Sequence, residues 1–413
     1  MMAAHQKKIL VFISASYVSG LEVVTLHLIR QLKERGHDVR CVVNGWNDGV
    51  FKAKLDEAKI PWYEVKLGWL YITKPWWTLD TLAHWPGAYR RCRKILRDFD
   101  PDICHFCTYA NVIMLYPLLK GRKSVHNLQE TDEPSKKNLW IYGTLNRRID
   151  IFTAVSGHIV KVLRNLDIPT EKIRLVYNGV PDLPVPAAAS EPRRTPGGTP
   201  DRTPGQTPDR APGQTPDRTP GRAPDRTPGR TPVLGIIGQV ASWKGHETLI
   251  DAAGILARSA EPTDFVIAVF GNDKNAFAAS LKDRIAREGL EKYFIWKGFL
   301  PDQAAIYDQV DIVVVPSLSQ EPCSLTILES MMRSKALIVS DRGGNPELVD
   351  HEDNGLIFPA EDAGKLAACI RLLLQNPDKT ARMEERAGAK ARKSFTDSHM
   401  TDVYIQAYTE LWN

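Results

Sequence analysis

Cysteines are few in this sequence, long apolar runs are missing and the net charge is small, and each of these properties excludes a class of protein. Six cysteines in 413 residues do not make the disulfide framework of a small secreted domain. No stretch reaches the roughly 18 apolar residues that a membrane-spanning helix needs. The net charge of +5 falls to about +2 outside residues 187–232, which gives no reason to expect nucleic-acid binding. A hydrophobic content of 43% is typical of a globular protein, and the length favours two domains.

Two short patterns resemble features of other protein classes, but their surroundings favour a structural role. Cys104 and Cys107 have CxxC spacing, yet the sequence has no second CxxC or nearby histidine pair to complete a zinc site, and their apolar run indicates core cysteines. The segment KKILVFISASYVSG has the charged-then-apolar pattern of a signal peptide. Because its apolar run is short and a charged, helix-like segment follows directly, we expect residues 9–14 to form the first buried strand.

The first half of the chain alternates short apolar runs with longer amphipathic ones. A helix is expected over residues 21–35, where apolar residues follow helical spacing and Gly36 supplies a stop. The expected strands are residues 9–14, 38–43, 103–106, 124–126, 151–155 and 173–177. Strands that alternate with helices pair in parallel, so the pattern predicts an α/β fold with a doubly wound sheet.

A proline-rich segment interrupts this alternation. Between Pro192 and Pro232 a proline recurs every four residues, in units such as TPDRTPGQ and TPDRTPGR. The segment has almost no apolar side chains to bury, and every fourth residue lacks a backbone donor, so it cannot form a core. We expect a disordered or extended tether over residues 183–232, with a docking site for a partner as the alternative.

Strands and helices alternate again after this segment. The expected strands are residues 233–238, 265–270, 294–297, 311–315 and 336–339, and the expected helices are residues 246–258, 278–288, 325–335 and 364–375. The sequence therefore predicts one Rossmann-like domain over residues 1–182 and a second over residues 233–394. Such folds bind ligands at the carboxyl ends of their strands, here in a cleft between the two domains.

The stretch EPCSLTILESM, residues 321–331, carries the most informative chemistry. Glu321 precedes an expected helix, and Glu329 lies on that helix. The free N–H groups of Cys323, Ser324 and Leu325 at the helix start, together with the helix dipole, form an anion site. Because a carboxylate repels phosphate, the two glutamates suit sugar and ribose hydroxyls. A solvated capping glutamate and an exposed helical glutamate are the alternative.

The same stretch resembles the EPFGLxxxEAM motif of retaining glycosyltransferase family 4, and other segments resemble motifs of that family in the same order. These segments are SGLE at 19–22, AVS at 154–156, KIRLVYNGV at 172–180, GQVASWKG at 238–245, SDRGGNPELV at 340–349 and NGLIF at 354–358. The resemblance runs from about residue 9 to the end of the chain, apart from the proline-rich segment. It implies the GT-B fold, in which two Rossmann-like doubly wound domains face each other across a cleft. It also implies that a last helix over residues 395–413 packs back on the first domain.

The resemblance further implies roles for individual residues. Glu329 would bind the ribose hydroxyls, Glu321 the donor sugar, and Lys244 the diphosphate, as a compact charge on a flexible stem. Gly20 would let the backbone of the first domain approach the phosphate. His126 would close a strand near the transferred sugar, with an ordinary structural histidine as the alternative. The implied catalytic residues are His126, Glu321 and Lys244, and the implied donor-binding residues are Gly20, Gln239, Lys244, Gly271, Phe299, Glu321, Cys323, Ser324, Leu325 and Glu329.

Three places depart from the family pattern. Gln239 stands where the family usually has a phosphate-binding arginine, which removes one positive charge from the leaving-group site. Cys323 and Ser324 replace Phe-Gly before the helix, and Pro181 replaces the aspartate that usually follows NGV. The two glutamates and the lysine are retained, so these departures bear on rate and donor preference.

Other patterns point to different kinds of site. Residues 98–100 form a DxD, the metal–diphosphate motif of the other glycosyltransferase fold, but this one precedes an expected strand and is interpreted as a solvated turn. No GxGxxG follows the first strand, which argues against a nicotinamide enzyme. Tryptophans gather among lysines and arginines at Trp62, Trp69, Trp76, Trp77 and Trp85. We expect core or domain-packing tryptophans there, with an interfacial patch or a lining of the acceptor cleft as alternatives.

The expected activity is metal-independent, retaining transfer of a sugar in glycan or polysaccharide synthesis. The donor would be a nucleotide sugar, UDP-linked rather than GDP-linked, and the acceptor a glycan, a lipid-linked molecule or a small molecule. Lys244 and the helix start at Ser324 would stabilise the leaving diphosphate as its charge develops. No cofactor, metal or nucleic-acid partner is expected. The alternatives are a catalytically weak nucleotide-sugar-binding protein and a nucleotide-sugar epimerase or hydrolase. The scattered thiols favour a cytoplasmic location, and a peripheral contact at the inner membrane face is left open.

Overall fold

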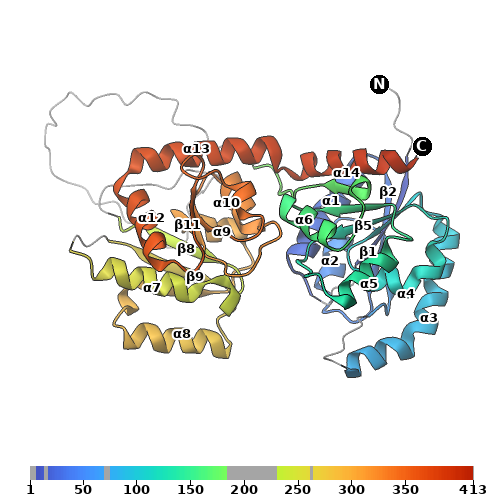
Figure 1. The fold of residues 1–413 in the computed structure, drawn as a ribbon, viewed down its shortest axis with the longest axis horizontal. Coiled ribbons are helices and arrows are strands. Elements are labelled where there is room, and N and C mark those ends of the chain that lie inside the picture. Colours follow the sequence, from blue (N-terminus) through green and yellow to red (C-terminus); the bar gives the residue numbers. More distant parts are fainter. Residues whose placement is uncertain (1–5, 14–16, 69–74, 184–229, 261–263, 413) are drawn as a thin grey trace, which may run out of the picture.

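The computed structural model describes residues 6–13, 17–68, 75–183, 230–260 and 264–412, and it shows two lobes, each built around one parallel sheet (Figure 1). The first sheet has the order β3-β2-β1-β4-β5-β6-β7. Its strands are β1 (Lys8–Ile13), β2 (Asp38–Asn44), β3 (Trp62–Val65), β4 (Ile103–Phe106), β5 (Ser124–Leu128), β6 (Ile151–Ala154) and β7 (Ile173–Leu175). The helices of this first lobe are α1 (Gly20–Glu34), α2 (Val50–Glu57), α3 (Pro75–Phe99), α4 (Tyr109–Leu115), α5 (Lys136–Leu145) and α6 (Gly157–Asn165).

The second lobe repeats this arrangement with the order β10-β9-β8-β11-β12-β13. Its strands are β8 (Val233–Ile237), β9 (Val266–Phe270), β10 (Phe294–Gly298), β11 (Ile312–Val315), β12 (Ala336–Ser340) and β13 (Leu356–Phe358). Its helices are α7 (His246–Ala257), α8 (Ala276–Arg287), α9 (Gln303–Tyr307), α10 (Leu325–Met332), α11 (Asn345–Leu348), α12 (Ala363–Gln375) and α13 (Pro377–Ser394). Both strand orders reverse direction beside the first strand of the sheet, which is the topology of a doubly wound Rossmann-like fold. The predicted α/β class is confirmed.

Buried apolar side chains on both faces of the strands explain why helices cover each sheet on two sides. In β1, Ile9 and Val11 belong to one hydrophobic cluster, and Leu10 and Phe12 belong to another. All four side chains are fully buried. Alternate residues of a strand point to opposite faces, so a continuous apolar run fits a strand that lies between two layers of helices.

The chain passes from the second lobe to the first between α13 and the last helix, α14 (Asp397–Trp412), which lies along the first lobe (Figure 1). It packs along α1 and buries Tyr404 and Tyr408 in the cluster that also contains Ile9 and Val11. The Tyr408 hydroxyl lies 2.8 Å from Nδ1 of His105, on β4. The C-terminal helix therefore contributes to the core of the first lobe, although it follows the whole of the second lobe in sequence.

Several expected boundaries differ from the observed elements. β5 continues to Leu128, because Asn127 and Leu128 stay buried and pair with β6. His126 therefore lies inside a strand, and the prediction that it closes one is wrong. β3 and β13 were not expected, since runs of four and three residues carry little periodicity. Almost all of the proline-rich segment lies outside the described residues, so the tether and the proposed domain boundaries stay predictions.

The tryptophans between residues 61 and 93 are not core residues as a group. Trp76 is 79% exposed, Trp77 49% and Trp85 39%, so the expectation of core or domain-packing tryptophans is wrong for these three. They lie on the first half of α3, which has few buried side chains. Trp69 lies outside the described residues. The DxD ends α3, where Asp98 pairs with Arg97 at the surface and Phe99 is buried between the two aspartates.

Candidate functional site

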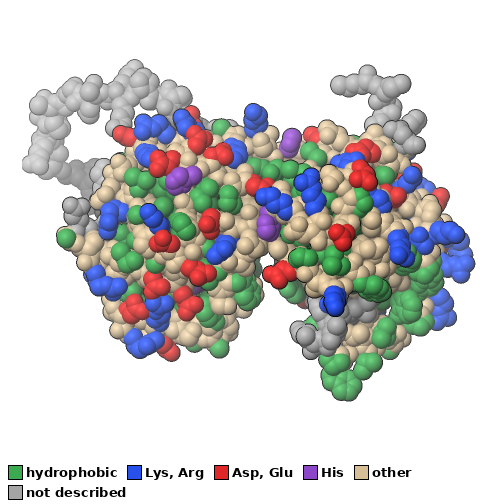
Figure 2. Space-filling model, in the orientation of Figure 1, with side chains coloured by type: hydrophobic (Ala, Val, Ile, Leu, Met, Phe, Trp, Pro, Cys, Tyr) green, Lys and Arg blue, Asp and Glu red, His purple; other side chains and the backbone are tan. Residues whose placement is uncertain are grey.

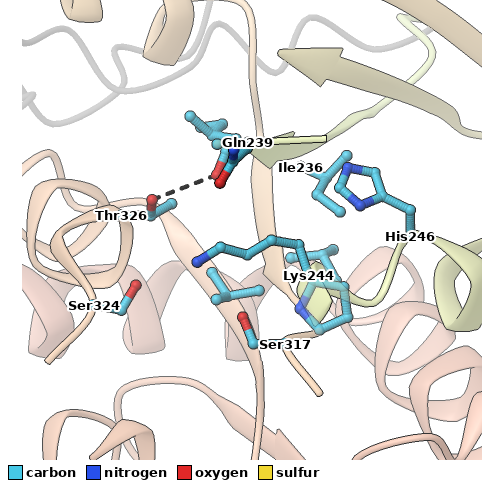
Figure 3. Close-up of a pocket in the computed structure, with 12 residues that line it drawn as sticks. Ile236, Gln239, Lys244, His246, Ser317, Ser324 and Thr326 are labelled. Atoms are coloured by element: carbon cyan, nitrogen blue, oxygen red, sulfur yellow. Dashed lines mark hydrogen bonds between the residues drawn. The ribbon is translucent and has the colours of Figure 1, made fainter. Parts of the chain in front are cut away.

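A pocket lies in the second lobe at the carboxyl ends of β8 and β11, beside the start of α10. Its empty volume is about 290 Å³, part of it open to solvent. The residues that line it are Ile236, Ile237, Gly238, Gln239, Lys244, His246, Val314, Val315, Pro316, Ser317, Ser324 and Thr326. Three predicted donor-binding residues, Gln239, Lys244 and Ser324, therefore come together here (Figure 3).

Glycines allow the loop after β8 to pass close to neighbouring backbone. Gly245 has φ +75°, and a Cβ on it would lie 1.8 Å from the carbonyl oxygen of Pro316. Gly271, at the end of β9, has φ +158°, and a Cβ there would lie 2.0 Å from the carbonyl oxygen of Gly238. Any side chain at either position would push the loop away from the strand ends. Gly271 therefore supports the pocket from behind and does not line it.

Lys244 and Glu321 form an ion pair at the mouth of this pocket. The Lys244 Nζ donates to Oε1 of Glu321 at 2.5 Å, and the Ser317 hydroxyl donates to the same oxygen at 2.7 Å. Figure 3 shows the Lys244 side chain extending toward the space between Ser324 and Thr326. The predicted phosphate-binding lysine and the predicted sugar-binding glutamate are thus in direct contact.

The start of α10 faces the other lobe. Ser324 is the N-cap residue, and no side chain caps the helix there. The first N–H groups of a helix have no partner within it and carry its positive dipole end. Gly20, the first residue of α1, lies close to Leu325, the first of α10: a Cβ on Gly20 would be 3.6 Å from the Leu325 Cδ1. Two helix N-termini, one from each lobe, therefore meet beside the pocket.

Glu329 is held inside the second lobe by α9. Its Oε1 accepts from the Gln303 amide at 2.7 Å, and its Oε2 accepts from the Tyr307 hydroxyl at 3.0 Å. Burial raises the pKa of Glu329, while the Tyr307 bond and the nearby Arg333 charge oppose that rise. Each carboxylate oxygen keeps a second lone pair, so a ribose hydroxyl could still donate to it.

His126 is completely enclosed in the first lobe. Its Nδ1 lies 3.1 Å from the carbonyl oxygen of Phe106 on the neighbouring strand, and its ring contacts Tyr142 and Phe152. Among the described residues, its Nε2 has no hydrogen-bond partner. Burial lowers its pKa to about 4, so the ring is neutral near pH 7. His126 does not line the pocket and sits behind the carboxyl end of the sheet.

The remaining predicted donor-binding residues lie around the pocket or away from it. Cys323 is buried, and its carbonyl oxygen accepts from the Asn178 amide of the first lobe at 3.3 Å. Burial raises the pKa of the Cys323 thiol to about 12, so it stays protonated. Phe299 follows β10, is 74% exposed and does not line the pocket.

The sequence interpretation missed several residues of the site. Ser317 and Thr326 line the pocket, and the Thr326 hydroxyl donates to the carbonyl oxygen of Ile237 at 3.4 Å. His246 also lines it, and burial lowers the pKa of that imidazole to about 4. Gln303 and Tyr307 hold Glu329. The spacing of 303 and 307 on one helix face was a usable signal, but a small hydroxyl residue after a strand or at a helix start carries none.

A glutamate of the second lobe joins the two lobes next to this site. Glu347, on α11, accepts from the backbone N–H groups of Gly157 at 2.6 Å and His158 at 2.7 Å, at the start of α6. It also accepts from the Tyr177 hydroxyl at 2.9 Å. A carboxylate at a helix N-terminus is stabilised by the free N–H groups and the dipole. Within the described ranges, no group of three or more His, Cys, Asp and Glu side chains gathers as a metal site.

Comparisons with known families agree with this geometry. Residues 18–182 match the model of "Glycosyltransferase Family 4", and residues 217–390 match that of "Glycosyl transferases group 1". An alpha-D-kanosaminyltransferase of Streptomyces kanamyceticus is 28% identical over 185 residues, which are 44% of this chain and 46% of that protein. The lipopolysaccharide core mannosyltransferase LpcC of Rhizobium leguminosarum is 29% identical over 164 residues, 40% of this chain and 46% of that protein. The matches thus span about half the length of these relatives.

Solved structures share the whole fold. A glycosyltransferase from Rickettsia africae superposes with a TM-score of 0.76 at 20% identity, over 99% of both chains. Alr3699/HepE of Anabaena, solved with UDP, has a TM-score of 0.74 at 19% identity over 98% of this chain and 100% of that one. Within the described ranges, no helix is long and apolar enough to cross a membrane. With two family models that together cover most of its length and the two-lobed GT-B fold, this chain belongs to the glycosyltransferases of the group 1 and family 4 type.

Proposed function

We propose that this glycosyltransferase moves a sugar from a UDP-sugar to a hydroxyl acceptor, with retention at the anomeric carbon and without a metal ion. The observation that carries the proposal is the pocket where Lys244, Ser317 and the uncapped start of α10 converge on one small volume. A protonated amine and a helix N-terminus together offer positive charge to a diphosphate. The complex of Alr3699/HepE with UDP supports a uridine nucleotide at this fold.

In this mechanism the bond between the anomeric carbon and the phosphate oxygen breaks, and its electron pair stays on the phosphate. Lys244 and the α10 N-terminus stabilise that developing charge. The acceptor oxygen forms a bond to the anomeric carbon on the same face, and its proton passes to the leaving phosphate. Glu321 holds hydroxyls of the donor sugar, and Glu329 holds those of the ribose. His126 stays in the proposal as a neutral group near the transferred sugar: its Nδ1 donates to the carbonyl oxygen of Phe106, so its unpartnered Nε2 can accept a hydrogen bond.

The proposed acceptor is a glycan, a lipid-linked molecule or a small molecule, and the proposed role is glycan synthesis. The names of the relatives support this range, because they include an alpha-D-kanosaminyltransferase and a lipopolysaccharide core biosynthesis mannosyltransferase. We also propose a cytoplasmic location and a peripheral contact with a membrane surface. The proposed domains are residues 1–182 and 233–394, joined by a tether at residues 183–232.

A binding protein with weak catalysis is the second candidate, favoured by one observation. Gln239 lines the pocket without the positive charge of an arginine, while Lys244 is neutralised by Glu321. A site with little net positive charge stabilises a leaving diphosphate less. Tight UDP binding without turnover against a panel of acceptors would favour this candidate. Release or inversion of the donor sugar without transfer would instead indicate a hydrolase or an epimerase.

The decisive test is Lys244→Ala, assayed for sugar transfer with and without EDTA. We expect turnover to fall by about two to three orders of magnitude, the scale of losing one preorganised stabilising group. Transfer by the unchanged protein should persist in EDTA, and product NMR should show the donor's anomeric configuration. Lys274→Ala is a matched control, since Lys274 is an exposed lysine of the same lobe outside the pocket. Loss of transfer in EDTA with rescue by manganese, alongside a harmless Lys244→Ala, would contradict the proposal.

A further inference from the structure

One face of α3 carries an exposed apolar stripe. Trp76 and Leu79 are 79% and 55% exposed, and Ala83 and Pro86 are exposed as well. These four residues are spaced three or four apart, so they share one face of the helix. The buried residues Thr81, Ala88, Cys92, Ile95 and Phe99 have the same spacing and mark the opposite face. The stripe therefore points away from the core of the first lobe.

The same face becomes basic further along the helix. Arg90, Arg93, Lys94 and Arg97 continue the spacing of the stripe, and all four are exposed. Arg90 Nε donates to the carbonyl oxygen of Pro86, which joins the basic half to the apolar half. Figure 2 shows hydrophobic side chains gathered at the lower right of the first lobe, where α3 begins, with Lys and Arg side chains beside them. We call residues 76, 79, 83, 86, 90, 93, 94 and 97 the α3 stripe.

The α3 stripe begins near the carboxyl edge of the first sheet. α3 follows β3, so its start lies at the carboxyl edge of a parallel sheet. Trp85, near the stripe, donates from Nε1 to the carbonyl oxygen of Met114 on α4, and α4 follows the carboxyl end of β4. That bond fixes the first half of α3 to the lobe although few of its side chains are buried. A surface bound to the stripe would thus contact the side of the first lobe that lies away from the second lobe (Figure 1).

We propose that the α3 stripe docks this enzyme on a bilayer that contains anionic phospholipids. Trp76 and Leu79 enter the boundary between headgroups and acyl chains, where an amphipathic indole is most stable. The arginines and the lysine of the second half bind lipid phosphates. The α3 stripe would supply the surface for the peripheral membrane contact, and anionic phospholipids would supply its lipid partner. This proposal rests on the membrane contact included in the proposed function.

Charge decides between a bilayer and a protein partner. A docking face for a second copy would be expected to be apolar at its centre with few charges. The α3 stripe instead carries four cations on one half, and the acidic residues of α3, Asp80 and Asp98, lie beside the stripe with Asp98 paired to Arg97. An anionic surface matches this distribution, and a bilayer also receives the exposed tryptophan and leucine.

The test is flotation of the full-length protein with vesicles, in the absence of any sugar donor. We expect binding to vesicles of phosphatidylcholine with 30% phosphatidylglycerol, and at least tenfold weaker binding to phosphatidylcholine alone. Trp76→Ser with Leu79→Ser, and separately Arg93→Glu with Lys94→Glu, should each reduce binding at least tenfold. Raised salt should weaken binding by the unchanged protein. Trp140→Ser is a matched control, because Trp140 is 67% exposed on α5, outside the stripe.

Three outcomes would overturn the proposal. They are no binding to anionic vesicles, equal loss in Trp140→Ser, and unchanged binding in both stripe variants. Dimerisation that disappears in the Trp76→Ser, Leu79→Ser variant, without vesicle binding, would assign the stripe to a second copy instead. Transfer to a soluble acceptor, measured on the same preparations, separates this result from the proposed function. If transfer is intact but the protein does not bind vesicles, only the proposed membrane contact is contradicted and the proposed activity stands.

Discussion

The contact between Lys244 and Glu321 gives each side chain a partner before any donor is present. A lysine on a flexible stem loses side-chain entropy when it is fixed, and Glu321 together with Ser317 fixes it at the pocket. In the proposed mechanism a diphosphate competes with Glu321 for the same amine. Once the phosphate binds Lys244, the Glu321 oxygen would be released to accept from a sugar hydroxyl. On this proposal the ion pair couples phosphate binding to sugar binding.

Glu321→Gln tests this competition. The amide keeps the shape of the carboxylate but removes a negative charge beside the phosphate site, so free UDP should bind about threefold to tenfold more tightly. Turnover should fall, because a neutral amide stabilises the developing positive charge of the sugar less. Titration calorimetry with UDP and a transfer assay measure the two effects. Weaker UDP binding in this variant would mean that Glu321 positions Lys244 and does not compete with the phosphate.

At the scale of elements, Glu347 connects α11 of the second lobe with α6 of the first through charge-assisted bonds. A Cβ on Gly157 would lie 3.1 Å from Glu347 Oε2, so a larger residue there would push the carboxylate back by a few tenths of an ångström. Because Gly20 and Leu325 also lie close together, the relative placement of the lobes would decide whether the proposed donor site is complete. Glu347 is therefore a positioning residue.

Glu347→Ala should destabilise the protein by about 1.5–3 kcal/mol, the scale of one hydrogen bond to a charged group. Tyr177→Phe removes only one of the three bonds to Glu347 and should cost about 0.5–1.5 kcal/mol. Chemical denaturation measures both, and a transfer assay should show a lower kcat in Glu347→Ala. Glu361→Ala is the control, since Glu361 is exposed and pairs with Arg342 within the second lobe. If all three variants were as stable as the unchanged protein, Glu347 would have no role in holding the two lobes together.

The sequence predicted several helices with regular apolar spacing and missed others, including α3 and α13, which span 25 and 18 residues. α1, α7 and α12 were expected within one residue or two of their observed bounds. An interfacial patch was only the alternative for the tryptophans of α3, because tryptophans resemble core residues in a sequence and exposure has no local signature. The pairing of Lys244 with Glu321 was also missed, since residues 77 apart meet only after both strands are in place. The order of the motifs pointed to residues that line the pocket, such as Gln239, Lys244 and Ser324. The contacts between their side chains could not be predicted from that order.

At the scale of the molecule, α14 ties the end of the chain to the first lobe through buried polar contacts. His105 on β4 is fully buried, has Tyr408 as its partner through Nδ1, and contacts the rings of Tyr404 and Tyr408. Burial lowers the pKa of His105 to about 3, with a smaller contribution from His126. Protonation of His105 would therefore weaken the packing of α14 on the first lobe.

Three buried histidines are expected to make the protein less stable in acid. The folded pKa values of His105, His126 and His246 are about 3, 4 and 4, against about 6.5 in an unfolded chain. Between about pH 6.5 and pH 4 the unfolded chain binds more protons, so folding stability falls as pH falls through this window. Each histidine contributes up to about 1.4 kcal/mol per pH unit. Glu22 and Glu329 act with the opposite sign, because burial raises their pKa and the folded state binds the extra protons.

Because these contributions overlap, a single variant isolates one of them. His105→Asn keeps a polar side chain beside Tyr408 but has no group that titrates, so its unfolding free energy should fall less steeply between pH 7 and pH 5 than that of the unchanged protein. The difference in slope should approach about 1.4 kcal/mol per pH unit near pH 5, where an unfolded histidine is protonated and His105 is not. Urea denaturation at pH 7, 6 and 5 gives the dependence of unfolding free energy on pH for both proteins. The comparison holds even if the substitution lowers stability at pH 7. Parallel loss of stability in the two proteins would show that His105 is protonated in the folded state, and the burial of this histidine beneath α14 would then have to be reconsidered.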